Sequence, residues 1–260
     1  MSQSILQVEE LTVSLSDHPD RKIVERVSFV VPPVSIVALV GGSGSGKTTT
    51  GLSVLRLLSP ALKMESGKIS FKGNDLSKMN SHEMNAIRGK EIGMVFQDPL
   101  QAFNPVFTVG FQVSEVLKYH TTMAHDDIKR KVLELFAQVG LNDPDRVYKS
   151  YPHQLSGGMR QRAMIAQAVA AGPSLLIADE PTSSLDVTLQ ARILELFLQL
   201  RDQYKLSMVL ITHDLGIVAH MADYIVVIEK GRVVEFGKTK DVLSHAKHSY
   251  TQQLMRTLND

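Results

Sequence analysis

The 260 residues are enough for one large domain or two small ones, and a composition of 43% hydrophobic and 21% charged residues is ordinary for a globular protein. The 28 basic and 27 acidic residues give a formal charge of +1, which argues against a nucleic-acid-binding surface. Because there is no cysteine, disulfides and cysteine-based metal or redox sites are excluded.

The apolar runs of the chain are short. Residues 36–40 and 163–171 are among the longest, and both fall far below the roughly 20 residues of a membrane-spanning helix. Residues 1–10 lack the basic segment of a signal peptide. We therefore expect no lipid anchor, and any association with a membrane to come through a partner protein.

The first part of the chain is predicted to be rich in strands. Residues 5–15 alternate apolar and polar side chains, whereas residues 36–40 are wholly apolar, as in a central parallel strand buried on both faces. A turn is predicted over residues 16–22 and a helix over residues 48–58. The strands expected here are residues 5–15, 24–31, 36–40, 68–72 and 92–96.

Helical patterns dominate after residue 97, and strands return later. Few strand signals occur over residues 98–163, so we expect an inserted helical subdomain there. Strands that alternate with helices favour an α/β fold with a mostly parallel sheet. The helices expected are residues 108–120, 126–139, 163–171, 186–204 and 249–258, and the later strands are residues 175–178, 208–211, 225–228 and 232–236.

A glycine-rich loop follows the apolar strand and precedes a helix. Residues 41–48 match the phosphate-loop pattern G-x-x-x-x-G-K-[ST]. Its glycines let backbone N–H groups face phosphate oxygens, and the helix adds the positive end of its dipole. Lys47 is suited to the β- and γ-phosphates and the Thr48 hydroxyl to Mg²⁺. The alternative is a flexible Gly/Ser turn. The predicted nucleotide-binding residues here are Gly41, Gly42, Ser43, Gly44, Ser45, Gly46, Lys47, Thr48 and Thr49.

Two carboxylates follow the apolar strand at residues 175–178. Asp179 is suited to holding Mg²⁺, often through water, and Glu180 lies one residue further on, where it could polarise an attacking water. The alternative is a solvated strand end. Because a phosphate loop occurs in the same chain, we favour the catalytic interpretation.

Gln97 and His213 each follow a predicted strand. Parallel strands bring their carboxyl ends to one sheet edge, where α/β proteins bind ligands. Gln97 could then reach Mg²⁺ or the attacking water, and His213 could donate a hydrogen bond to the γ-phosphate. Either residue alone would be interpreted as polar surface.

A second glycine-lined helix start lies at residues 155–162. Ser156 is placed to cap the helix, while Gly157 and Gly158 carry no side chain over the backbone amides. The alternative is an ordinary capped helix. One nucleotide does not need two phosphate cradles in one chain, unless the second serves a partner's nucleotide.

Together these motifs resemble the ATP-binding cassette (ABC) transporter ATPases. The phosphate loop, Gln97, Leu-Ser-Gly-Gly at residues 155–158, Asp179-Glu180, Ser-Ser-Leu-Asp at residues 183–186 and His213 occur in that family's order, and the match covers essentially the whole chain. The Leu-Ser-Gly-Gly element separates this family from other P-loop ATPases.

The resemblance implies one ABC ATPase domain over residues 1–260. Its P-loop NTPase core would comprise residues 1–97 and 164–240, with an antiparallel β edge, a helical subdomain at residues 98–163 and a helical tail at residues 241–260. It also implies a head-to-tail dimer in which Ser156, Gly157 and Gly158 of one subunit face the partner's ATP, with Asp186 at the seam.

Three segments look like the dipeptide, oligopeptide and nickel importer ATPases: residues 96–100, 103–110 and 248–251. Residues 159–162 and 164–166 are similar to the first of the two paired ATPases of those importers. The implied partners are two integral-membrane permeases, a second related ATPase and an extracytoplasmic binding protein. The implied location is the cytoplasmic face of the inner membrane. The solute, whether peptide, nickel or metal chelate, is not identified by the sequence.

Two positions depart from the family pattern. An adenine-stacking aromatic is expected near Leu15, yet the nearest aromatics are Phe29 and Phe71. Val34-Ser35 stands where Gly-Glu is usual before the central strand. The alternatives that remain are a regulatory subunit that binds ATP with little hydrolysis, and a non-transport member of the family.

Overall fold

The chain divides into two compact units in the computed structural model, which describes residues 4–183 and 185–256. The first unit comprises Met1–Met84 and Lys205–Asp260, and the second comprises Asn85–Tyr204. The division implied by the family resemblance, with a helical subdomain at residues 98–163 inserted into the core, stays a prediction.

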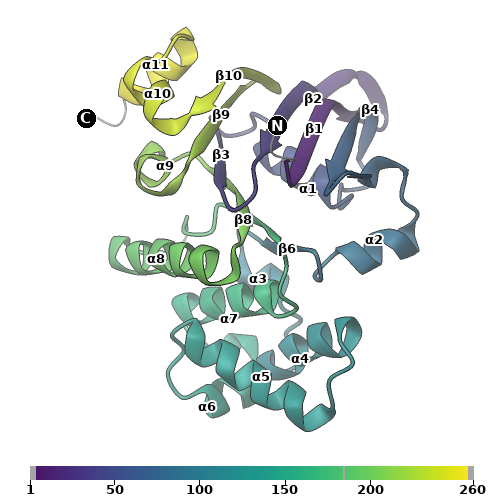
Figure 1. The fold of residues 1–260 in the computed structure, drawn as a ribbon, viewed down its shortest axis with the longest axis vertical. Coiled ribbons are helices and arrows are strands. Elements are labelled where there is room, and N and C mark those ends of the chain that lie inside the picture. Colours follow the sequence, from purple (N-terminus) through teal and green to yellow (C-terminus); the bar gives the residue numbers. More distant parts are fainter. Residues whose placement is uncertain (1–3, 184, 257–260) are drawn as a thin grey trace. The chain divides into compact units, whose positions relative to one another are not determined.

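An antiparallel sheet begins the first unit. Its strands β1 (Leu6–Leu15), β2 (His18–Val31), β4 (Leu62–Phe71) and β5 (Asn74–Asp75) lie in the order β2-β1-β4-β5 (Figure 1). The predicted turn over residues 16–22 is wrong in its length, because β2 already starts at His18. Pro19 is tolerated there since β2 is an edge strand of this sheet, where a missing N–H breaks no ladder.

The buried strand β3 (Ile36–Val40) is central to the first unit. It lies between β8 (Ser207–Thr212) and β9 (Tyr224–Glu229) and runs parallel to both. All five of its residues are buried, which explains the continuous apolar run. Strand β10 (Arg232–Lys238) returns antiparallel to β9. The hairpin turn is made by Lys230 and Gly231, both at positive φ, as in a type I′ turn.

The first helix of the first unit is shorter than the sequence predicted. Helix α1 (Lys47–Val54) ends before the expected residue 58, because Arg56 adopts a left-handed backbone and the Leu57 N–H closes onto the Leu52 carbonyl. The last helix is α11, and residues 257–258 of the predicted range lie outside the described part. The remaining helices are η1 (Leu76–Lys78), α2 (Ser81–Ile87), which crosses the boundary of the two units, α9 (Leu215–Met221), α10 (Thr239–Ser244) and α11 (Ser249–Arg256).

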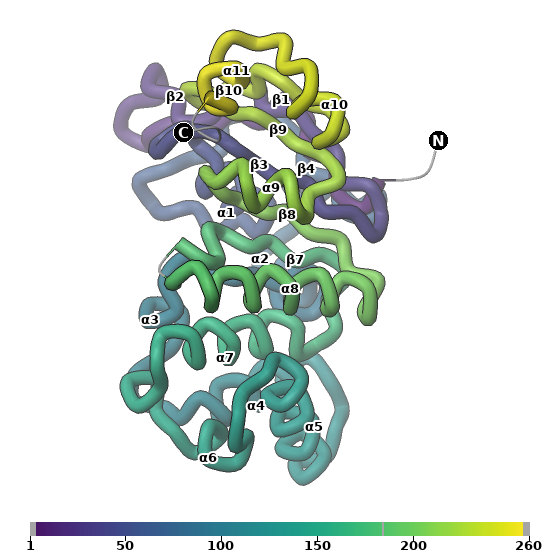
Figure 2. The backbone as a smooth tube through the Cα atoms, turned by 90° about the vertical axis from the view of Figure 1, so that its left-hand side faces the viewer, coloured from purple at the N-terminus to yellow at the C-terminus, as the bar shows by residue number. Residues whose placement is uncertain are grey.

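The second unit contains one parallel strand pair and a set of helices. Strand β6 (Ile92–Val95) pairs with β7 (Leu175–Asp179). Helices α4, α5 and α6 pack on one another, and α4 and α5 also pack against α7 (Figure 2). Val132, Leu135 and Phe136 of α5 are buried, as on the apolar face of an amphipathic helix. The helices are α3 (Pro99–Ala102), α4 (Val109–His120), α5 (His125–Gln138), α6 (Pro144–Lys149), η2 (Pro152–Gln154), α7 (Gly157–Val169) and α8 (Val187–Tyr204).

None of the helices within residues 4–183 and 185–256 combines the length and the apolar character that crossing a membrane requires.

The turn before β3 is strained at Val34. This β-branched residue has φ = +52°, a left-handed conformation in which glycine is the usual residue. Its N–H donates to the Ser207 hydroxyl at 2.8 Å, and the Ser35 hydroxyl donates to the Pro32 carbonyl at 2.7 Å. These contacts hold the turn in a conformation that glycine would adopt without this strain.

Replacing Val34 by glycine is expected to raise the free energy of unfolding by about 1 kcal/mol. The left-handed conformation costs a non-glycine residue about 1–2 kcal/mol, and the added freedom of glycine in the unfolded chain offsets about 0.5–1 kcal/mol of that gain. Urea unfolding of V34G measures this change in the free energy of unfolding. V30G is the control, because Val30 lies in β2 at an ordinary φ. V30G should be less stable than the parent. If V34G is also less stable, the backbone at Val34 is not strained.

Candidate functional site

The glycine-rich loop leaves the end of β3 against its neighbour β9. A Cβ on Gly41 would lie 2.1 Å from the Ile228 carbonyl oxygen, so no side chain fits there. Gly46 has φ = +98°, and its Cβ would lie 2.8 Å from the Ile23 carbonyl oxygen. The loop therefore needs glycine at these positions for close backbone approach as well as for its curvature.

Lys47 lies folded back over the loop. Only 5% of it is exposed, and its Nζ donates to the carbonyl oxygens of Gly41 at 2.8 Å and Gly42 at 2.9 Å. Helix α1 begins at Lys47 after Gly46, which has no side chain to cap the first amides, and the buried Ser45 Oγ has no hydrogen-bond partner within the described residues. A cation, an uncapped helix start and glycine-lined backbone fit a nucleotide phosphate.

His213 lies at the same sheet edge as this loop. Val40 pairs with Thr212 in the parallel register of β3 and β8, so Gly41 and His213 follow neighbouring strand ends, as expected. His213 is exposed, and the next residue, Asp214, caps α9 by accepting from the Gly216 N–H at 2.7 Å. The role of His213 at the γ-phosphate stays a prediction.

Gln97 and Glu180 come together in the second unit. The register Val95↔Ala178 places their strand ends at one edge, and Gln97 Nε2 lies 3.4 Å from Glu180 Oε2, a long hydrogen bond. Asp179, the last residue of β7, is only 4% exposed.

Glu180 itself has φ = +41°. The Ser183 N–H, at 3.2 Å, and its hydroxyl, at 3.1 Å, both donate to the Glu180 carbonyl and hold this turn. Strained residues of this kind concentrate at functional sites.

Ser156 and Asp186 both cap helices in the second unit. The Ser156 hydroxyl accepts from the Met159 N–H at 3.3 Å at the start of α7, and Asp186 Oδ1 accepts from the Leu189 N–H at 2.9 Å at the start of α8. A Cβ on Gly158 would lie 3.2 Å from Leu189, whereas Gly157 faces open space. The capping role of Ser156 was expected. The roles of all four residues toward a partner's nucleotide stay predictions, and Ser184 of the same motif lies outside the described residues.

The predicted site residues are thus divided between the units. The first unit holds residues 41–49 and His213, and the second holds Gln97, Ser156, Gly157, Gly158, Asp179, Glu180 and Asp186. The aromatics nearest to Leu15 in the sequence do not compensate for the missing adenine stack, because Phe29 and Phe71 are buried in the antiparallel sheet at 4% and 1% exposure.

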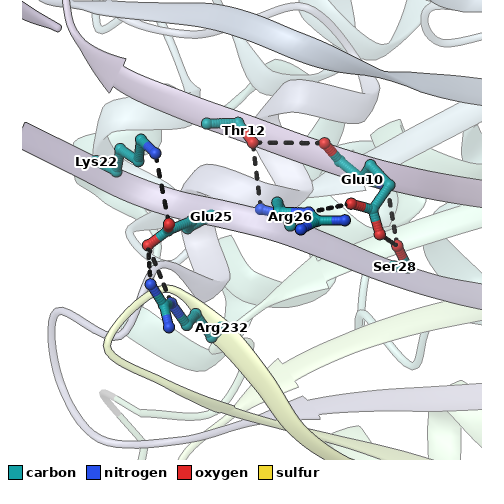
Figure 3. Close-up of polar contacts among 7 residues, drawn as sticks. All are labelled: Glu10, Thr12, Lys22, Glu25, Arg26, Ser28 and Arg232. Atoms are coloured by element: carbon teal, nitrogen blue, oxygen red, sulfur yellow. Dashed lines mark hydrogen bonds and ion pairs between the residues drawn. The ribbon is translucent and has the colours of Figure 1, made fainter. Parts of the chain in front are cut away.

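The sequence did not predict how the loop is held from outside. The Gly231 N–H at the β9–β10 turn donates to the Ser45 carbonyl at 3.0 Å, and the Gly231 carbonyl accepts from the Glu25 N–H at 2.7 Å. Figure 3 shows Arg232 reaching across to Glu25, with Nε at 3.0 Å and Nη2 at 2.8 Å from Oε2. The Arg232 side-chain hydrogen bond lowers the pKa of the Glu25 carboxyl below its usual range. This ion pair fixes the hairpin tip that supports the loop.

A neighbouring cluster stiffens the same strands. In Figure 3, Arg26 donates to Glu10 across β1 and β2, and its N–H donates to the Thr12 hydroxyl at 3.2 Å. The Ser28 hydroxyl accepts from the Glu10 N–H at 2.9 Å. No sequence motif signals these contacts, because their members lie up to 18 residues apart.

Comparison with known proteins identifies the family of this chain. Residues 24–183 match the family model described as ABC transporter. The peptidoglycan transport ATP-binding protein YejF of Agrobacterium fabrum is 45% identical over 98% of this chain, which spans only 47% of YejF. The dipeptide transport ATP-binding protein DppD of Haemophilus influenzae is 43% identical over 98% of this chain and 78% of DppD.

A solved structure has the same fold. The ATP-binding cassette MJ0796, in a dimeric post-hydrolysis state bound to ADP and Pi, matches with a TM-score of 0.80 and 25% identity over 90% of this chain and 98% of that chain. The chain belongs to the ABC transporter family. Within it the chain is an ATP-binding subunit whose ATP hydrolysis drives transport.

The Glu25–Arg232 pair predicts a pH-dependent part of the stability. Because the folded-state pKa of Glu25 is lowered, its contribution is full above the unfolded value of about 4.3 and is lost as the pH falls through the lower folded value. E25Q should therefore be slightly less stable than the parent at pH 7, and the difference should shrink on acidification. Urea unfolding between pH 7 and pH 3.5 tests this.

The double variant E25Q/R232Q is the control for that measurement. If the pair is the cause, adding R232Q should remove little more stability than E25Q alone. A difference between parent and E25Q that stays constant down to pH 3.5 would contradict the assignment.

Proposed function

We propose that this chain energises an importer of peptides. The observation that supports a peptide as the solute is the similarity to the dipeptide transport protein DppD over 78% of that protein's length. The segments over residues 96–110 support the same branch of the family. Nickel or a metal chelate is the alternative solute, since importers of both kinds share these segments.

The residues of the first unit would bind the nucleotide. Lys47 has three N–H donors and would exchange its bonds to the Gly41 and Gly42 carbonyls for the β- and γ-phosphate oxygens. The amides at the start of α1 would donate to the same phosphates. His213 would donate a hydrogen bond to the γ-phosphate. This contact would distinguish ATP from the diphosphate product, which has no γ-phosphate.

The residues of the second unit would carry out hydrolysis. Glu180 would accept a proton from the attacking water, and Gln97, which contacts Glu180, would orient that water. As Mg²⁺ ligands, Gln97 and Asp179, together with Thr48 of the phosphate loop, would supply the amide, carboxylate and hydroxyl oxygens that this ion prefers. When bound, the ion would neutralise charge on the phosphates.

A second ATPase subunit would complete each site. Ser156, Gly157 and Gly158 offer a capped helix start with an open glycine, and we propose that they bind the γ-phosphate of the partner's nucleotide, with Asp186 at the seam. The dimeric state of MJ0796 with ADP and Pi supports this arrangement. The partner would be a related ATPase or a second copy.

The full system would also contain two permeases and an extracytoplasmic binding protein. The chain would then act at the cytoplasmic face of the membrane.

The burial of Phe29 and Phe71 bears on nucleotide binding, because neither residue would offer adenine an aromatic platform. The Gln97–Glu180 contact supports hydrolysis over the regulatory alternative that the sequence left open.

Replacing Glu180 by glutamine is expected to lower kcat for ATP by about 10²–10⁴-fold, the usual contribution of a general base. ATP binding should remain, since Glu180 is not in the phosphate loop. Phosphate release by the assembled transporter measures this, with E195Q as the control because Glu195 is an exposed carboxylate of α8 in the same unit. Hydrolysis by E180Q at the rate of E195Q would refute the assignment.

The same variants test the solute class. Cells that carry the parent or E195Q should take up a labelled dipeptide, and cells that carry E180Q should not. If E180Q cells still take up the dipeptide but no longer take up nickel, the peptide assignment is wrong and nickel is the solute.

A further inference from the structure

The phosphate loop has a hydrogen-bond partner in the last described helix. Tyr250 of α11 accepts a hydrogen bond at its hydroxyl from the Gly42 N–H at 2.7 Å. The two residues are 208 positions apart and belong to the first unit. A Cβ on Gly42 would lie 3.2 Å from this hydroxyl, so the contact is close.

Tyr250 and Lys47 hold the same peptide group from its two ends. The peptide between Gly41 and Gly42 is planar, so its carbonyl and its N–H turn together. Lys47 Nζ donates to that carbonyl at 2.8 Å, and Tyr250 accepts from that N–H. Because glycine flanks the peptide on both sides, few steric barriers would otherwise fix its orientation.

The Tyr250 hydroxyl is held in place by packing and by backbone contacts. The ring packs against the apolar cluster that includes Val40 and Leu215. The Tyr250 N–H donates to His248 Nδ1 at 3.2 Å, a contact within the same segment.

Glu235 of β10 anchors the segment before α11. It accepts from the backbone N–H groups of Lys247 at 2.9 Å and His248 at 3.1 Å. Burial alone would raise the pKa of Glu235, but these hydrogen bonds, together with Thr251 and the charge of His248, lower the pKa below its usual value. The carboxylate thus stays ionised at neutral pH and fixes the start of the helix.

We propose that Tyr250 is a positioning residue for nucleotide binding. It acts through the Gly41–Gly42 peptide, whose orientation it keeps when Lys47 leaves the loop carbonyls for phosphate oxygens. A loop that is already ordered loses less conformational freedom on binding, so its affinity is higher. This inference rests on the proposed function, because it assumes that the loop binds a nucleotide.

The test compares Y250F with the parent in the full chain. Y250F removes the hydroxyl and keeps the ring that packs in the cluster. We expect the dissociation constant for MgADP, measured by calorimetry, to rise about five-fold, as for the loss of one hydrogen bond. We also expect hydrogen exchange of a peptide covering residues 41–48 to become faster, while exchange of β1 is unchanged. A purely structural role would lower the unfolding midpoint without changing this affinity.

Y224F is the matched control. Tyr224 lies on β9 in the same unit and stacks near Phe236 at 6.4 Å, away from the loop contacts described above. It should bind MgADP as the parent does. If Y250F binds within two-fold of Y224F, or if exchange of residues 41–48 is unchanged, the proposal is overturned. If the parent itself does not bind MgADP, the proposed function fails, while the exchange measurement still decides whether Tyr250 orders the loop.

Discussion

The close approach of the loop backbone to its neighbouring strand is the constraint on which the nucleotide site depends. Strand β3 is buried between two parallel strands, and the loop leaves it with Gly41 so near the Ile228 carbonyl that a Cβ would lie 2.1 Å away. The parallel register then brings His213 to the same edge through the pair Val40 and Thr212. From this strand end the loop leads to the start of α1, whose first amides are available to phosphate.

The elements around the loop form hydrogen bonds with its backbone carbonyl and N–H groups. Lys47 binds two loop carbonyls, the Gly231 N–H binds the Ser45 carbonyl, and Tyr250 binds the Gly42 N–H. These contacts come from the helix after the loop, the β9–β10 turn and the last described helix. A glycine-rich loop would be flexible alone, and support from three directions orders it before a ligand arrives. In the second unit, predicted site residues also have a structural role, since Ser156 and Asp186 each cap the start of a helix.

The sequence predicted what depends on local pattern. The buried strand, the loop and the carboxylates at Asp179 and Glu180 are contiguous motifs with a direct chemical meaning, and the strand register places them as expected. It could not predict contacts between distant residues, such as Tyr250 with Gly42. It also missed backbone exceptions: Arg56 ends α1 in a conformation usually given to glycine, Val34 adopts another, and β2 starts at His18 despite Pro19. These outcomes reflect tertiary packing that overrides local preference.

Calorimetric titration of the full chain with MgADP, comparing Lys47→Ala with Lys240→Ala, tests the central claim most directly. Lys240 is an exposed lysine of α10 in the same unit. If the ordered loop presents Lys47 to the phosphates, the Lys47 variant should bind at least about ten-fold more weakly, as the loss of a charge-assisted hydrogen bond predicts, while the Lys240 variant should bind as the parent does. Equal affinity in all three proteins would contradict the account.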